Sequence, residues 1–434
     1  MLENSIQIAG LRLHFLPVEM RVPLKFGAQV LTSVVCARAR IELAGGNGRT
    51  AIGWGETPLS VGWVWPSGLS FESREERLKG FCRRLATDLA EGGYAIDHPF
   101  RFGHDYLEKR LPELVMAEAE GHPEDGPIPQ LASLACLSLF DLALYDAFAT
   151  LHDSSVFSLF TADWMGEDLA AYLEPGERFA GKFPADYLCA RENVLPVWHL
   201  VGGLDPVDEG DLTGEEPDDG YPVLLRDWIR EDGLKCLKIK LRGDDSAWDF
   251  DRFLRIGAMA IEEGVEALSA DFNCTVTDPS YVNDILDRLR ADHPAVSDLL
   301  LYVEQPFPHD LAANRIDVHS VSARKPLFLD ESAHDWKFVR MGRELGWNGV
   351  ALKTCKTLTG AILSLCWARE HGMDLMVQDL TNPMFAAIPH CLLAAHAGTI
   401  MGVECNGMQF YPEASLPELE IHPGIFRRRG GVVE

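Results

Sequence analysis

The sequence lacks the features that mark secreted, membrane-spanning or zinc-binding proteins. Its ten cysteines form no C-x-x-C pair, and no cysteines and histidines have the spacing of zinc ligands. No uncharged apolar run reaches the ~20 residues of a membrane span. The first residues show neither the basic nor the apolar region of a signal peptide. We therefore expect a cytoplasmic protein with reduced, mostly buried cysteines.

Positive charge is also scarce. The chain has 39 lysines and arginines against 66 aspartates and glutamates, which gives a formal net charge of −27. Such a surface repels phosphate backbones, so we expect neither nucleic acid nor a membrane as a partner. A small carboxylate substrate is still allowed, because a metal ion and a few lysines can reverse the field inside one pocket.

The first third of the chain, residues 1–155, is predicted to be an α+β domain. Residues 5–56 alternate apolar and polar positions around the break GGNG, which predicts an antiparallel meander of three strands. Between residues 73 and 150 the apolar period becomes that of helices, as in EERLKGFCRRLATDLA.

The remainder, residues 156–407, alternates short apolar strands with amphipathic helices, which predicts parallel βα units. Eight strands between 195 and 406 fit a closed barrel, for which ~250 residues is typical. An open doubly wound sheet is the alternative, although no G-x-G-x-x-G follows any strand. The strands are LPVWHLVGG, LKCLKIKL, ALSADFN, LLYVEQPF, PLFLDES, GVALKT, LMVQDL and TIMGVECN.

Two connecting segments are less regular. The elements of residues 157–194 cannot be placed from the sequence. Residues 203–220 contain eight acids and read as a solvated surface loop. A calcium loop is the alternative, but the pattern D-x-[DN]-x-[DN]-G is absent.

Polar side chains follow the middle strands in order. They are Lys238, Lys240, Asp271, Asn273, Glu304, Asp330, Glu331 and Lys353. The successive intervals from 240 to 271, 304, 330 and 353 are 31, 33, 26 and 23 residues, each close to one βα unit of ~30 residues. In a barrel these strand ends meet at one mouth, so three carboxylates would converge. They would repel each other without a cation, and oxygen ligands suit Mg²⁺ before Mn²⁺ or Ca²⁺.

The lysines suggest acid/base chemistry. Lys238 and Lys240 share one face of a strand, whereas Lys353 comes from a strand well around the ring. A lysine near a divalent cation and a second lysine has a lowered pKa and can act as a neutral base. A lone strand-end carboxylate is usually a helix cap, and a lone lysine is usually on the surface. The ordered set on five successive strands therefore carries the prediction.

The strings CLKIKLRG, ADFN, YVEQPF, FLDES, ALKTCK and GWGETPLS resemble the enolase superfamily. The resemblance covers nearly the whole chain and is strongest to the two-lysine, muconate lactonizing-like subgroup of the mandelate racemase/muconate lactonizing enzyme family. It implies a (β/α)7β barrel of the TIM type under a cap formed by the N-terminal third and residues 408–434. It also implies Mg²⁺ ligands at Asp271, Glu304 and Asp330, acid/base catalysts at Lys240 and Lys353, a carboxylate contact at Lys238, and supporting groups at Asn273 and Glu331.

The sequence also departs from that pattern. Residues 157–220 form a longer segment than expected, and the chain ends in GGVVE without a Pro-Gly-rich tail. The seventh strand ends in Gln378 and Asp379, so a His/Asp dyad is not indicated. His390 and His396 fall in a predicted helix, where we expect them to pack.

Substrate selection is predicted to involve the cap loops Pro23–Phe26 and Leu59–Pro66, with Trp63 as a substrate-binding residue. The alternative is that the tryptophans only pack the cap on the barrel. Glu404 stands where dipeptide epimerases carry ammonium-binding aspartates, and Asn273 is a further candidate.

The expected reaction is metal-dependent removal of the proton next to a substrate carboxylate, through an enediolate. It would racemise or epimerise an amino-acid-like carboxylate, with Mn²⁺ as a substitute for Mg²⁺, in a homo-oligomer. The alternatives are a lyase or cycloisomerase with the same residues, and a degenerate barrel that only binds.

Overall fold

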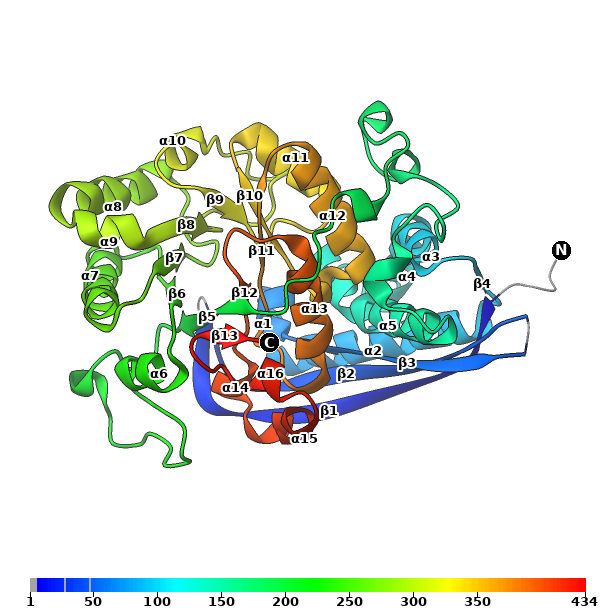
Figure 1. Ribbon diagram of the computed structural model, residues 1–434, viewed down its shortest axis with the longest axis horizontal. Helices are drawn as coiled ribbons and strands as arrows, with labels where there is room; N and C mark the ends of the chain where they lie inside the picture. The colour runs from blue at the N-terminus through cyan, green and yellow to red at the C-terminus, as the bar shows by residue number, and fades with distance from the viewer. Residues whose placement is uncertain (1–5, 27–28, 47) are drawn as a thin grey trace.

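A four-stranded antiparallel sheet begins the chain in the computed structural model, which describes residues 6–26, 29–46 and 48–434. Its strands run in the order β3-β2-β1-β4. The bounds are Ile6–Phe26 for β1, Gln29–Ala44 for β2, Thr50–Pro58 for β3 and Ala95–Ile96 for β4. The three-stranded meander is therefore confirmed, and β4 adds a short fourth strand at the edge (Figure 1).

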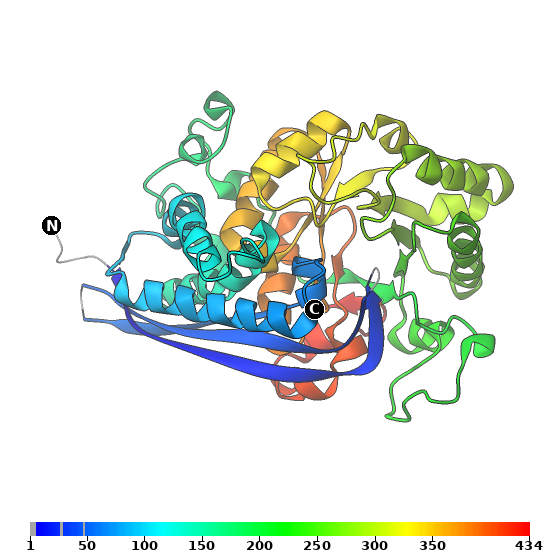
Figure 2. The same cartoon turned by 180° about the vertical axis from the view of Figure 1, so that it is seen from behind.

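Helices cover one face of this sheet and complete the cap. They are α1 (Val61–Val64), α2 (Phe71–Glu91), α3 (Pro99–Asp105), the π-helical turn η1 (Tyr106–Arg110), α4 (Leu111–Ala119) and α5 (Gln130–Leu151). Figure 2 shows α2 lying along the sheet. Helix α5 has the length and apolar composition of a membrane span, and most of it is buried inside the protein.

Two glycines of β3 allow α5 to rest directly on the sheet. A Cβ on Gly53 would lie 2.1 Å from the backbone nitrogen of Ala147, and one on Gly55 would lie 2.0 Å from the carbonyl oxygen of Leu139. No other residue fits such spacing, because real Cβ atoms do not approach backbone atoms so closely. The motif G-W-G therefore sets the distance between sheet and helix.

Eight parallel strands form a nearly closed ring, as predicted. The hydrogen-bonded order is β11-β10-β9-β8-β7-β6-β5-β12, and β11 also contacts β12. The strands are β5 (Leu195–Val201), β6 (Cys236–Lys240), β7 (Ala267–Asp271), β8 (Leu300–Glu304), β9 (Leu327–Leu329), β10 (Gly349–Leu352), β11 (Asp374–Val377) and β12 (Val403–Glu404). Because β11 and β12, at the two ends of this order, also contact each other, the open doubly wound alternative is wrong.

Helices surround the ring and bury the outer faces of its strands (Figure 1). They are α6 (Leu225–Asp232), α7 (Ser246–Glu263), α8 (Pro279–Asp292), α9 (Pro294–Leu299), α10 (His319–Ser322), α11 (Trp336–Leu345), α12 (Leu358–Glu370) and α13 (Ala387–Ala397). Large side chains, among them Trp198, Tyr302 and Phe328, pack against one another inside the ring. Inside the ring, the polar strand ends therefore lie above a packed apolar layer.

The two irregular segments contain only short 3-10 turns. In residues 157–194 these are η2 (Val156–Leu159), η3 (Leu169–Ala171), η4 (Gly176–Arg178) and η5 (Pro184–Asp186). Residues 203–220 form a largely exposed loop with one turn, η6 (Glu209–Asp211), which confirms the surface-loop prediction. Arginine side chains pair with the acids of this loop: Arg255 lies 2.7 Å from Asp208 and 2.6 Å from Asp211.

The tail was expected to return to the cap. It contains α14 (Gly407–Phe410), η9 (Glu413–Ser415), α15 (Leu416–Ile421), α16 (Pro423–Phe426) and β13 (Val432–Val433). Phe410 and Tyr411 pack with Val18 and Leu24 of the cap sheet. The last strand, β13, instead pairs antiparallel with the barrel strand β5. The tail therefore joins the cap and the barrel.

Candidate active site

Strand register places the predicted site residues next to one another at the carboxyl ends of the ring. Lys240 pairs with Asp271 across β6 and β7, and Asp271 pairs with Glu304 across β7 and β8. Asp330 directly follows β9, and Lys353 directly follows β10. All five side chains are at least nine-tenths buried. The prediction that the strand ends bring these groups to one mouth is therefore confirmed.

The two candidate acid/base lysines face each other across the mouth. In the strand order, three strands separate β6 from β10 on one side, and three strands separate them on the other. Lys240 and Lys353 therefore come from opposite walls of an eight-stranded ring. Both line the same small cavity, of about 40 Å³, at the centre of the mouth.

Lys238 lies among three carboxylates. Its Nζ is 2.6 Å from Oε1 of Glu304, 3.1 Å from Oε2 of Glu404 and 3.4 Å from Oδ2 of Asp271. Burial lowers the pKa of Lys238, but these carboxylates outweigh burial and hold it well above the ordinary value. The ammonium of Lys238, which was expected to contact a substrate carboxylate, therefore already contacts three carboxylates of the protein.

Asp330 is held by two lysines. Oδ2 lies 3.3 Å from Nζ of Lys353, and Oδ1 lies 3.4 Å from Nζ of Lys356, which also donates a hydrogen bond to the backbone oxygen of Asp330. Burial raises the pKa of Asp330, but Lys353, Lys356 and Lys238 together outweigh burial and hold it below the ordinary value. Lys240 in turn donates a hydrogen bond to Asp271.

The pKa of Lys353 depends on the charged groups around it. A depressed lysine pKa was expected for a lysine beside a divalent cation and a second lysine, and this stays a prediction. Burial is the largest single influence and lowers the pKa, but Asp330, Glu404 and Glu304 together outweigh burial, and the net pKa lies above the ordinary lysine value. The difference arises because the expected depression requires a divalent cation, whereas here the carboxylate charge acts on the lysine directly.

The predicted metal ligands fit a hard divalent cation in their chemistry. Asp271, Glu304 and Asp330 offer only oxygen donors, and 3% or less of each residue is exposed. Burial raises the pKa of Glu304 well above its usual range, and Asp271 and Asp330 add to this despite Lys238. The site is therefore short of positive charge. Among the described residues, however, no three Asp, Glu, His or Cys side chains are already arranged around a metal position.

Trp63 brings the cap into the mouth. Its Nε1 donates a hydrogen bond of 3.0 Å to Oε1 of Glu331, and its ring centroid lies 5.3 Å from Nζ of Lys353. Burial and the charge of Asp330 raise the pKa of Glu331 to about 7. Both tryptophans belong to the cap core, and Trp65 stacks under Arg77, at 4.8 Å. The two tryptophans therefore differ, because only Trp63 lines the mouth.

Glu404 is fully engaged on the other side of the mouth. Oε1 accepts a 2.8 Å hydrogen bond from Nδ2 of Asn406, and Oε2 faces Lys238. His390 and His396 lie in α13. His390 bonds the backbone oxygen of Glu404, and His396 stacks on a phenylalanine ring. The predicted packing role of the two histidines is confirmed.

Asn273 lies beside Lys240 at the edge of the site. Both line a second cavity of about 260 Å³ together with Lys25 from the cap hairpin. The backbone of Asn273 has a φ of 51° and donates to Oδ1 of Asp271. Its buried Nδ2 has no hydrogen-bond partner among the described residues.

Sequence reasoning missed three residues of this region. Lys356 contacts Asp330, and its signal is the second lysine of ALKTCK. Gln378 donates to Glu304 and to the hydroxyl of Tyr302. Asp141, in the cap helix α5, accepts hydrogen bonds from the first turn of α12, which follows Lys353 and Lys356. No local signal marks Asp141, because its partners lie more than 200 residues away.

No protein-family model matches the sequence, and no curated protein matches it. Solved structures do. A dipeptide epimerase from Cytophaga hutchinsonii, complexed with Mg and D-Ala-L-Val, superposes with a TM-score of 0.62 at 16% identity, over 95% of this chain and 89% of that chain. The fold is that of the enolase superfamily.

Two other solved structures with this fold belong to enzymes that are named for different reactions, a racemase and a lactonizing enzyme. The N-succinyl Arg/Lys racemase from Bacillus cereus matches with a TM-score of 0.62 at 16% identity, covering 94% of this chain and 89% of that chain. The muconate lactonizing enzyme from Pseudomonas fluorescens matches with a TM-score of 0.59 at 14% identity, covering 92% and 87%. At these identities the likeness establishes the fold, and the chemistry has to be argued from the site.

Proposed function

We propose that the protein is a metal-dependent isomerase of the enolase superfamily that moves the proton next to a substrate carboxylate. The observation that carries this proposal is the opposition of Lys240 and Lys353 across one mouth, with three buried carboxylates between their strands. A single base suffices to remove a proton from one face of a carbon. Two lysines on opposite walls suit an exchange between stereoisomers, in which one lysine removes the proton and the other returns it.

In this proposal Asp271, Glu304 and Asp330 hold Mg²⁺, with Mn²⁺ as a substitute. The cation would hold the substrate carboxylate and stabilise the negative charge that develops on it. Lys240 serves one stereoisomer and Lys353 the other. In each direction the lysine that does not remove the proton stays protonated and donates from the opposite face.

The surrounding contacts hold Lys353 in its protonated form. The backbone oxygen of Asp379 accepts a 2.8 Å hydrogen bond from Lys353, and Asp330 faces the same ammonium at 3.3 Å. Both contacts hold the lysine in one orientation. Trp63 of the cap lines the mouth on that side, with its ring centroid 5.3 Å from Nζ of Lys353. Lys353 would then act as the acid for the stereoisomer whose proton Lys240 removes.

The walls of the mouth favour a substrate with an apolar side chain and an acylated amine. Leu24, Leu31, Leu200 and Leu380 line the central cavity. Glu404 already faces Lys238 and Asn406, so it offers little to a free ammonium group. Donors line the adjoining cavity instead, where Nδ2 of Asn273 has no partner among the described residues. An acyl carbonyl oxygen would accept from this amide, which points to N-acyl amino acids.

The test is α-proton exchange in D₂O, followed by NMR for each stereoisomer of N-acetyl- and N-succinyl-leucine in the presence of Mg²⁺. The wild type is expected to exchange both isomers. Lys240→Ala and Lys353→Ala are each expected to stop interconversion but to retain exchange for opposite isomers. Lys235→Ala is the matched control, because this partly exposed lysine lies just before the same strand as Lys240.

Two outcomes would contradict parts of the proposal. Equal loss of exchange for both isomers in both variants would overturn the two-faced arrangement and favour an elimination or cycloisomerisation by the same residues. Absence of exchange with N-acyl amino acids, dipeptides, proline derivatives and acid sugars would overturn the isomerase proposal. A calorimetric titration with Mg²⁺ separates that case from a degenerate barrel, which would bind no cation.

A further inference from the structure

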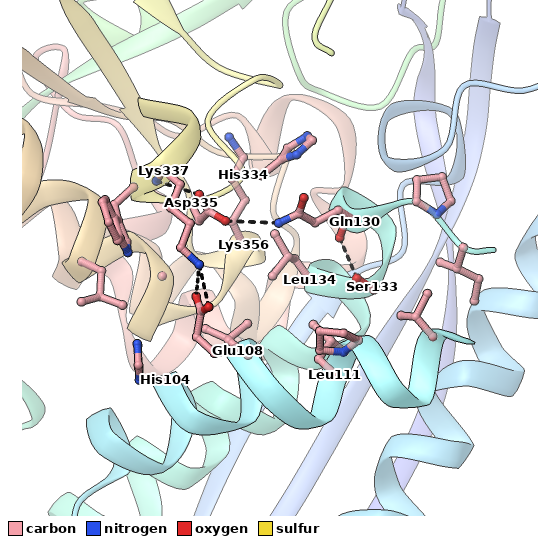
Figure 3. Close-up of a pocket in the computed structure, with 18 of the residues that line it drawn as sticks. His104, Glu108, Leu111, Gln130, Ser133, Leu134, His334, Asp335, Lys337 and Lys356 are labelled. Atoms are coloured by element: carbon pink, nitrogen blue, oxygen red, sulfur yellow. Dashed lines mark hydrogen bonds and ion pairs between the residues drawn. The ribbon is translucent and has the colours of Figure 1, made fainter. Parts of the chain in front are cut away.

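A further cavity lies between cap and barrel, away from the mouth. Its volume is about 520 Å³, within the range of small-molecule sites. The cap contributes η1, α4 and the start of α5, and the barrel contributes α11 and α12. Figure 3 shows two bonds that join the walls: Gln130 donates to Asp335 at 3.2 Å, and Lys337 donates to Glu108.

Most of the cavity wall is apolar. Leucine, valine, isoleucine and proline side chains of the cap face the indole of Trp336 and the side chain of Leu363. The charged groups Glu108 and Lys337 are within 2.7 Å of each other, so their charges offset. A charged ligand would therefore find no unpaired charge to bind here, whereas an apolar ligand would bury apolar surface against the wall.

Polar atoms without partners lie in the same wall. His334 is only 8% exposed, and neither of its ring nitrogens has a hydrogen-bond partner among the described residues. The indole Nε1 of Trp336, which is 4% exposed, is also without one. Burial lowers the pKa of His334 to about 3, so its ring is neutral near pH 7. It then offers one donor and one acceptor, and Trp336 adds a donor.

Buried polar groups in folded proteins are almost always hydrogen-bonded, so three such atoms in one cavity wall call for an occupant. We propose that this cavity is a second binding site, for a small uncharged molecule with an apolar body and a primary amide or hydroxyl at one end. The polar end would accept from Trp336 and both donate to and accept from His334. Water alone would form the hydrogen bonds of the polar atoms, but the apolar wall would stay exposed to water.

Lys356 connects this cavity to the mouth. Its side chain lines the cavity, and its ammonium contacts Asp330 and lies 5.6 Å from the ring centroid of Trp63. An occupant would therefore restrict the segment that carries Lys356. The binding site itself is argued independently of the proposed reaction, so it can be tested without a substrate.

The probe is 3-phenylpropanamide, with its N,N-dimethyl analogue as a version that lacks the donor. Calorimetry and ligand-observed NMR are expected to give saturable one-to-one binding of the primary amide, with a dissociation constant on the order of 1 mM or tighter. The dimethyl analogue is expected to bind about tenfold more weakly. Hydrogen exchange should slow in α4, α11 and α12 when the amide is bound.

Variants locate the binding. Val115→Trp places an indole from α4 inside the cavity and should abolish binding, whereas Glu120→Trp adds the same side chain at the exposed end of that helix and should not. His334→Phe keeps the ring and removes both polar atoms, and it should weaken the amide to the level of its dimethyl analogue. If Val115→Trp does not fold, Leu107→Trp fills the cavity from η1.

The proposal is overturned if the wild type shows no saturable binding, because water alone then occupies the cavity. It is equally overturned if binding survives in the cavity-filling variants, since the amide would then lie elsewhere. Undiminished affinity in His334→Phe would remove the polar end from the proposal and leave only an apolar pocket.

Discussion

Replacing Glu56 with glutamine should change how the stability of the protein depends on pH. Glu56 ends the G-W-G-E motif of β3 and is 1% exposed. Its Oε2 accepts a 2.5 Å hydrogen bond from Nε of Arg38 on β2. Burial raises the pKa of Glu56 from 4.5 to about 7, although Arg38 lowers it in part. The buried carboxylate is therefore only partly compensated.

The sign and size of the effect follow from that shift. Between pH 4.5 and about 7 the folded protein holds a proton on Glu56 that the unfolded chain has lost, so stability falls as pH rises through this range. A shift of about 2.5 units corresponds to about 3 kcal/mol at 1.36 kcal/mol per unit. Glu56→Gln cannot ionise, so it should lack this contribution to the slope.

The assay is urea unfolding, monitored by tryptophan fluorescence, at pH 5, 6, 7 and 8. Relative to the wild type, Glu56→Gln is expected to gain about 2.5 kcal/mol between pH 5 and pH 8, because pH 5 lies just above the pKa of an unfolded glutamate. Glu42→Gln is the control, because Glu42 lies on β2 and pairs with Arg40 at 3.4 Å but is part-exposed. Parallel pH profiles for the wild type and Glu56→Gln would show that the buried ion pair compensates the carboxylate fully.

Two further predictions concern the metal ligands and the cap. Asp271→Asn, Glu304→Gln and Asp330→Asn should each weaken Mg²⁺ binding in calorimetry by at least about tenfold while circular dichroism stays unchanged, and unchanged affinity in one of them would remove that residue from the metal site. Gly55→Ala should destabilise the protein to urea by about 3 kcal/mol, because its Cβ would lie 2.0 Å from the carbonyl oxygen of Leu139. Gly68→Ala, with open space around its Cβ, is the control, and equal loss in both would refute the close-packing argument.

The sequence predicted the barrel because its signals are local and repeated. Each strand is short and apolar, each is followed by a helix, and polar residues recur at strand ends one βα unit apart. Parallel strands all point the same way, so their carboxyl ends lie at one edge of the sheet. This alone predicts that Asp271, Glu304 and Asp330 lie together. Lys240 and Lys353 follow by the same argument.

The rest depends on contacts between distant segments, which no local pattern encodes. Asp141 caps the first turn of α12 from a cap helix, and Trp63 reaches Glu331 across 268 residues. The charge state of Lys353 likewise depends on which carboxylates surround it. Burial lowers the pKa of Lys353, whereas Asp330, Glu404 and Glu304 together raise it above the ordinary lysine value.

The mouth of the barrel has walls of two origins. The lysines and carboxylates belong to barrel strands and their ends, whereas Leu24, Leu31 and Trp63 come from the cap. A substitution in the cap can therefore change which molecule fits the mouth, while the lysines and carboxylates of the barrel stay in place. With the proposed function, such a chain could change its substrate during evolution in small steps and keep its reaction at each of them.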